Sequence, residues 1–314
     1  MRRRARAPAS WRSASTDLHL LPALLQPVKD AAIRFVKTSL APNDRVVIVR
    51  TSRSEDSKFT NDVPTLVEQI EKITSPPQAV ADNGERCLQI TPHEAYKIAE
   101  SMDPGDRLLS AKTAECSACY HLACPVDMVS ARARTIWAHT RTSTTNALAV
   151  IDSLVDGMAK LPGERIILLT SGGFLTGTFE TEVDRLMDKS RHAEVLINGL
   201  DARGLYQDAS GGMAYDGMGV LASGTGGTFF HNNNDMEEGL RVLGMVPETT
   251  YLLGFSPPAA IAPTFHKLKV RLPADHGYSL EARLGYNELP KPTASIDTEA
   301  LATDTITDLP GASA

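Results

Sequence analysis

The sequence predicts an α/β protein with a Rossmann-like, doubly wound and mostly parallel sheet. Two runs of consecutive aliphatic residues carry this prediction, VVIV at 46–49 and IILL at 166–169. Strands of a parallel sheet are covered by helices on both faces and therefore lack the alternation of polar and apolar residues that a half-exposed strand shows. Segments with helical periodicity lie between the runs, and this repeated order of helix and strand is typical of the class.

The first half of the chain supplies three of the expected helices. An apolar stripe at helical spacing predicts an amphipathic helix within residues 17–40, and the stripe consists of Val28, Ala31, Ala32, Phe35 and Val36. After the strand at 46–49, a second helix begins near Pro64, because proline favours the first turn of a helix. A third runs from about residue 129 to 158 and stops before a Pro-Gly pair.

The second half continues the alternation. The strand at 165–170 is followed by a helix at about 180–193 and by a third strand that ends at Asp201. Residues 218–230 predict a short helix, a glycine turn and a short strand, 235–246 a further helix, and 249–257 the last strand of the main series. Apolar and basic residues then alternate along "FHKLKVRL", which predicts a C-terminal antiparallel β-hairpin at about 264–285.

Composition and charge exclude several classes of protein. The 314 residues are 42% hydrophobic and carry a formal net charge of −6, so we expect no nucleic-acid partner. No run of about 18 apolar residues exists, and we therefore expect no transmembrane segment. The arginine-rich residues 1–16 lack the apolar core of a secretory signal and predict a disordered basic leader, and residues 288–314 predict a disordered tail.

All four cysteines fall in a region of weak periodicity at about 75–129, which we interpret as an insertion that is helical around 92–102. Cys116, Cys119 and Cys124 have the spacing C-x2-C-x4-C with His121 among them, and Cys87 is more distant. Three interpretations remain open: disulfides in an exported protein, reduced thiols, or a zinc site that lacks the usual second pair of ligands.

Six segments in a fixed order resemble the von Willebrand factor A (vWA) domain, in particular the bacterial VWFA-related family. They are AAIRFVKTSLAPNDRVVIV, LPGERIILLTSGGF, INGLDARGLY, LASGTGGTFF, TTYLLGFSP and the hairpin FHKLKVRL with LEARLGY, all within about residues 28–287. The resemblance implies a Rossmann-like sheet flanked by helices, with a trailing hairpin, in a domain at about 17–287. It also implies an exported or surface protein.

The resemblance further implies where a divalent cation such as Mg²⁺ or Ca²⁺ binds in the wider fold. An Asp-x-Ser-x-Ser turn after the first strand, a threonine and an aspartate after a later strand hold the ion, and such hard oxygen ligands suit it. Here Ser171 stands in place of that aspartate, Thr144 or Thr145 matches the threonine, and Asp201 is the residue to test for residual ion binding. No segment matches the turn or its strand. We therefore expect no metal or other cofactor and a missing first strand, unless the strand, the ligands and an export signal lie upstream of Met1.

The resulting functional prediction is a non-catalytic interaction or adhesion module with a degenerate metal-ion-dependent adhesion site and an unidentified protein or surface partner. The expected binding loops are 171–179 and 201–217, with the cysteine-bearing insertion as a further candidate, and an extracytoplasmic location is expected if an export signal precedes this sequence. In "DARGLY", we expect Asp201 to cap backbone amides and Arg203 to pair with a carboxylate. The enzyme alternative is an α/β hydrolase that uses Ser171, although "LTSGG" lacks the first glycine of a nucleophile elbow.

Overall fold

The computed structural model describes residues 2–3, 10–15, 20, 22–42, 44–51, 58–74, 87–100, 102, 104–174, 178–205, 217–244, 251–252, 265–271 and 285–287. The chain divides into two compact units, Met1–Leu252 and Leu253–Ala314. The first unit contains the central sheet and its helices, and the second contains a short antiparallel strand pair.

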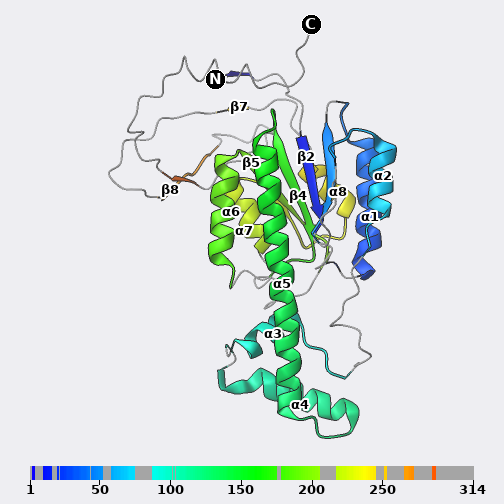
Figure 1. Cartoon of the computed structure of the whole chain (residues 1–314), viewed down its shortest axis with the longest axis vertical. Helices are drawn as coiled ribbons and strands as arrows, with labels where there is room; N and C mark the ends of the chain where they lie inside the picture. Colours follow the sequence, from blue (N-terminus) through cyan, green and yellow to red (C-terminus); the bar gives the residue numbers. More distant parts are fainter. Residues whose placement is uncertain are drawn as a thin grey trace. The chain divides into compact units, whose positions relative to one another are not determined.

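The first unit is a mixed α/β structure built on a five-stranded sheet with the spatial order β3-β2-β4-β5-β6. The strands are β2 (Ser10–Ser15), β3 (Arg45–Arg50), β4 (Arg165–Ser171), β5 (Val195–Asp201) and β6 (Phe229–Phe230). Every neighbouring pair is parallel. All five strands therefore point the same way, and their carboxyl ends share one edge of the sheet (Figure 1).

Strand β2 corrects two predictions, that the first strand is missing and that residues 1–16 form a disordered leader. It lies between β3 and β4 and pairs with both, so that Ser13 stands opposite Ile48 on one side and Leu168 on the other. The sequence SWRSAS gave no strand signal because it lacks the aliphatic run expected of a central strand. Backbone groups on both flanking strands need ladder partners, and this segment supplies them.

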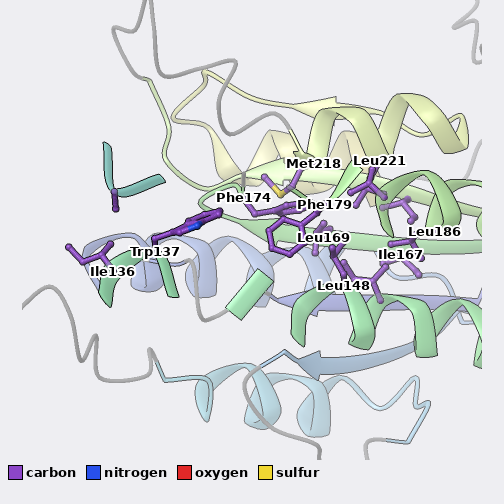
Figure 2. Packing of buried hydrophobic residues seen from close by; sticks show 14 of the residues in the cluster. Ile136, Trp137, Leu148, Ile167, Leu169, Phe174, Phe179, Leu186, Met218 and Leu221 are labelled. Carbon is purple, nitrogen blue, oxygen red and sulfur yellow. The ribbon is translucent and has the colours of Figure 1, made fainter. Parts of the chain in front are cut away.

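Consecutive aliphatic residues in β4 serve opposite faces of the sheet. Ile167 and Leu169 belong to a core formed with α5 (Val126–Ala159), α6 (Glu180–His192) and α7 (Gly217–Thr225). Figure 2 shows this core, in which both side chains lie near Leu148 of α5. Ile166 and Leu168 belong to a second core with α1 (Pro22–Thr38), α2 (Val63–Glu71) and α8 (Met236–Gly244). Because helices cover both faces of β4, residues that point to either face must be apolar, and this explains the uninterrupted aliphatic run.

The predicted insertion is a helical lobe held together by two disulfides. It consists of α3 (Pro92–Ala99), a short 3-10 helix (Pro104–Asp106), α4 (Arg107–Tyr120) and the first half of α5. Cys87 is bonded to Cys119 and Cys116 to Cys124, which decides among the three cysteine interpretations. The helix expected around 92–102 is present as α3. The sequence did not predict α4, because only Cys116 of its residues is buried and no apolar stripe marks it.

Helix α5 joins the lobe to the sheet. Its 34 residues begin three positions before the predicted start. It contacts α3 and α4 as well as β2, β4 and β5, and Figure 1 shows the first half beside the two helices and the second half beside the sheet. Trp137 marks the junction, since its Nε1 donates to Glu100 Oε1 and its ring lies 4.9 Å from that of Tyr96. The apolar faces of both halves form one continuous core.

Of the segment expected as the last strand of the main series, 249–257, the structure describes only Tyr251 and Leu252, and these two residues pair outside the large sheet. Strand β7 (Tyr251–Leu252) pairs antiparallel with β1 (Arg2–Arg3), which places a second short strand inside the predicted leader. In the second unit, β8 (Phe265–Lys267) pairs antiparallel with β9 (Gly285–Asn287), as the predicted hairpin requires. The predicted tail at 288–314 lies outside the described residues.

Candidate functional site

The strand order identifies the edge of the sheet where a ligand is expected. The chain passes from β2 to β3 on one side and then to β4 on the other, so the winding direction reverses between β2 and β4. In open parallel sheets, ligands bind outside the carboxyl ends of the strands at such a switch point. Ser15 and Ser171 end these two strands, and Asp201 ends β5 beside β4. We call this region the carboxyl edge.

Ser171 is completely buried and its side chain shapes the turn that follows β4. Its Oγ accepts a hydrogen bond from the Gly173 N–H at 3.1 Å, and its carbonyl accepts one from the Ala202 N–H at 2.8 Å. Gly173 has a φ of 90°, a conformation that glycine adopts without steric cost. The next residue, Phe174, is buried beside Gly217 of α7. The hydroxyl therefore holds a loop in place and is not presented to solvent.

Asp201 is also fully buried, and Arg203 takes up both oxygens of its carboxylate. Arg203 Nε lies 2.9 Å from Oδ1 and 3.1 Å from Oδ2, and one terminal guanidinium nitrogen lies 2.6 Å from Oδ2. The backbone N–H of Arg203 donates to Oδ1 at 3.0 Å. The expectations that Asp201 caps a backbone amide and that Arg203 pairs with a carboxylate are confirmed, and the paired carboxylate is Asp201 itself.

The two threonine candidates lie on different faces of α5. Thr144 is fully buried on the face that covers the sheet, whereas Thr145 is exposed. A side chain directed to solvent on a helix cannot join a site whose other members are buried at the end of β4 and β5. Thr144 thus stays a candidate by its position, and Thr145 is separated from Ser171 and Asp201.

The loops after β5 and β6 are fastened to each other at the carboxyl edge. The Leu205 N–H donates to Asn234 Oδ1 at 2.8 Å, and Gly204, with a φ of 74°, lets the backbone pass close to that amide. Leu205 itself is 64% exposed. Residues 175–177 and 206–216 of the two predicted partner loops lie outside the described residues. The described part presents a polar surface with one exposed leucine.

A second surface feature lies on the lobe, which the sequence made a further candidate for the binding surface, although none of its exposed apolar residues was singled out. Tyr120, Leu122, Val126 and Met128 are exposed around the connection between α4 and α5, and we call these four residues the lobe tip. Sequence reasoning missed them because single apolar residues near a cysteine pair look like core residues. Only the positions of the two helices show that these side chains face solvent.

Within the described ranges, no cluster of three or more His, Cys, Asp and Glu side chains is arranged to hold a metal ion. Nor does any described helix combine the length and the apolar character needed to cross a membrane.

No known family model matches the sequence, and no curated protein matches it. Among solved structures, the chain is similar to a crystal structure of an aerotolerance-related membrane protein from Bacteroides fragilis with multiple mutations to serines. The similarity covers 76% of this chain and 97% of that chain, with a TM-score of 0.38 and 10% sequence identity. A likeness at this level carries no information about function.

Proposed function

We propose that the chain is a vWA-like, Rossmann-type interaction module that binds a protein or surface partner without catalysis and without a bound cation. Support comes from the parallel strand order, from the residues quoted above for the resemblance, and from the Asp201–Arg203 ion pair. This ion pair is the observation that carries the proposal.

The physical reason is competition for the carboxylate. A divalent cation in an oxygen site needs carboxylate lone pairs directed at it. Both oxygens of Asp201 instead accept hydrogen bonds from Arg203, and the guanidinium neutralises the negative charge. Ser171, where the vWA pattern has an aspartate, adds only a neutral hydroxyl that already accepts from Gly173. The carboxyl edge therefore offers no unpaired carboxylate among these candidate residues.

Calorimetric titration of the purified chain with Mg²⁺ and with Mn²⁺ tests this proposal. We expect no saturable heat from either ion. One-to-one binding that is lost in Asp201→Asn would overturn the proposal, and Asp235→Asn, a change in an exposed loop carboxylate, serves as the matched control.

The alternative function is a hydrolase that uses Ser171, and the position of this serine after a central strand is the observation in its favour. An activated serine needs a base within hydrogen-bonding reach. Ser171 Oγ accepts a hydrogen bond from the Gly173 N–H, which is a donor and not a base, and the serine is not exposed. A panel of fluorogenic esters decides the question: we expect no turnover, whereas turnover that Ser171→Ala abolishes in a normally folded variant would establish the hydrolase.

A further inference from the structure

The lobe extends past the carboxyl edge of the sheet. Helix α5 packs on the sheet and is joined to the start of β4 by residues 160–164, so the helix and the strand run in opposite directions. The 34 residues of α5 span about 50 Å, whereas the seven residues of β4 span about 23 Å. The first half of α5, with α3 and α4 beside it, therefore lies beyond the end of β4 at which Ser171 stands (Figure 1).

One core connects the lobe to the loop after β4. Leu88 at the start of the lobe, Trp137 of α5 and Phe174 of this loop belong to the same cluster of buried side chains. Figure 2 shows Trp137 and Phe174 next to one another within it. Phe174 is 1% exposed and follows Gly173, whose N–H donates to Ser171 Oγ at 3.1 Å. The position of Trp137 therefore affects a loop of the proposed interaction site.

Helix α3 and the residue after it hold Trp137 in place. The indole Nε1 donates to Glu100 Oε1, and the ring of Tyr96 lies 4.9 Å from that of Trp137. At the other end of the same segment, Leu88 is buried in the core and comes directly after Cys87. A displacement of the segment that begins at Cys87 is therefore transmitted to Trp137 through α3.

The Cys87–Cys119 disulfide attaches this segment to α4. Helix α4 buries only Cys116 of its own residues, so apolar packing contributes little to its attachment. The Lys112 ammonium adds a non-covalent contact, because it donates to a backbone carbonyl of the segment at 3.0 Å. Cys119 is exposed and Cys87 half-buried, whereas the Cys116–Cys124 disulfide is buried. Exposed disulfides are the ones that thiols reduce most readily.

From these observations we propose that the Cys87–Cys119 disulfide is a redox switch for the loop after β4. A dithiol reductant supplies two electrons and two protons: the S–S bond breaks, Cys87 and Cys119 become thiols, and the dithiol closes to its own disulfide. The lobe then passes from a docked to a loosened state, Trp137 loses its fixed neighbours, and the loop at 171–174 opens more often. The inference rests on the proposed function for the role of this loop in binding, but the coupling itself does not depend on it.

Amide hydrogen exchange, followed by NMR on the full chain, tests the coupling without any partner. Gly173 is the reporter, and Gly239 of α8, which packs on the opposite face of the sheet, is the control. Dithiothreitol is added until alkylation shows that the Cys87–Cys119 disulfide alone is reduced. We expect exchange at Gly173 to rise about tenfold and exchange at Gly239 to stay constant. An unchanged rate at Gly173, or an equal rise at both glycines, overturns the proposal and leaves the proposed interaction site untouched.

Variants locate the path of the coupling. Cys87→Ser/Cys119→Ser lacks the switch, and its Gly173 should exchange at the fast rate with or without dithiothreitol. Glu100→Ala removes the acceptor of the Trp137 Nε1–H, whereas Glu100→Gln keeps an oxygen there. We expect fast exchange at Gly173 in oxidised Glu100→Ala and the wild-type rate in oxidised Glu100→Gln. Equal rates in these two variants contradict a path through Trp137.

Discussion

Arg203 holds the completely buried carboxylate of Asp201 in a two-pronged ion pair, although only one residue separates them in the chain. The pair closes the turn after β5 at the edge where parallel sheets bind ligands. A buried carboxylate requires a compensating charge. In this protein the compensation comes from within the chain, which makes Arg203 the residue whose removal is most informative.

Replacement of Arg203 by glutamine leaves the Asp201 carboxylate buried without its cation. We expect Arg203→Gln to lower the free energy of unfolding by about 3–5 kcal/mol, measured by urea denaturation at neutral pH. Arg241→Gln is the matched control, because the Arg241–Glu238 pair is exposed and such pairs contribute about 1 kcal/mol or less. Equal losses in both variants would contradict the role given to Arg203.

Acidification should weaken the lobe through Glu94. Burial opposes ionisation of Glu94, but the Thr91 N–H and the Lys112 ammonium outweigh this and hold its pKa below the ordinary 4.5. A lowered pKa contributes stability above the unfolded value, and this stability is lost as the pH falls through the folded value. Thermal unfolding followed by the fluorescence of Trp137, in a Trp11→Phe background, should show a loss below about pH 4.5.

Glu94→Gln separates this effect from general acid unfolding. The variant should start less stable at neutral pH and lose less stability between about pH 5 and pH 3 than the parent chain. An identical pH profile for parent and variant would exclude Glu94 as the source.

Lys112, the partner of Glu94, titrates at the opposite end of the pH scale. Burial lowers the pKa of Lys112, but the carboxylates of Glu94 and Glu115 outweigh burial, so that the pKa is raised above the ordinary 10.5. The contribution of Lys112 to stability therefore persists to alkaline pH and is lost only above 10.5.

The two disulfides should differ in their reaction with thiols. Cys119 is exposed, whereas Cys116 is fully buried and its partner Cys124 nearly so. Attack on a disulfide requires access to a sulfur atom. We therefore expect Cys87–Cys119 to be reduced first under increasing concentrations of a small thiol, as measured by alkylation and peptide mass analysis. Earlier labelling of Cys116 and Cys124 would contradict the described burial.

Gly227 lies where the chain enters β6 and passes against the backbone of β5. A Cβ atom at this position would come within 2.8 Å of the Ile197 carbonyl carbon, which belongs to a central strand and has no room to move. We expect Gly227→Ala to cost about 1–3 kcal/mol in urea denaturation. The control is Gly224→Ala in α7, where the new methyl group meets the flexible side chain of Met187.

Much of the fold could be predicted from hydrophobic pattern, and the exceptions have a common cause. The runs at 46–49 and 166–169 revealed β3 and β4 because both faces of these strands are covered. Strand β2 has the sequence SWRSAS, and it forms because the backbone N–H and C=O groups of β3 and β4 need hydrogen-bond partners. The composition of the segment alone does not show this requirement. Helix α4 was missed for a similar reason, since two disulfides hold it in place of an apolar stripe.

The candidate site was only partly visible in the sequence. Ser171 and Asp201 could be identified because each ends a recognisable strand, and the register places them side by side. The burial of both residues depends on the loops and helices packed above them. Sequence spacing likewise could not separate Thr144 from Thr145, because neighbouring helix residues diverge by about 100° and only the docking of α5 shows which one faces the sheet.

The most direct test of the cation-free site is thermal unfolding of the wild-type chain in EDTA, in millimolar Mg²⁺ and in millimolar Ca²⁺. A cation bound only by the folded state would stabilise it by about 2.7 kcal/mol at a concentration of about 100 Kd. Because Arg203 already pairs with Asp201, we predict the same unfolding temperature in all three conditions. A higher unfolding temperature with either cation, abolished by Asp201→Asn, would contradict this account of the carboxyl edge.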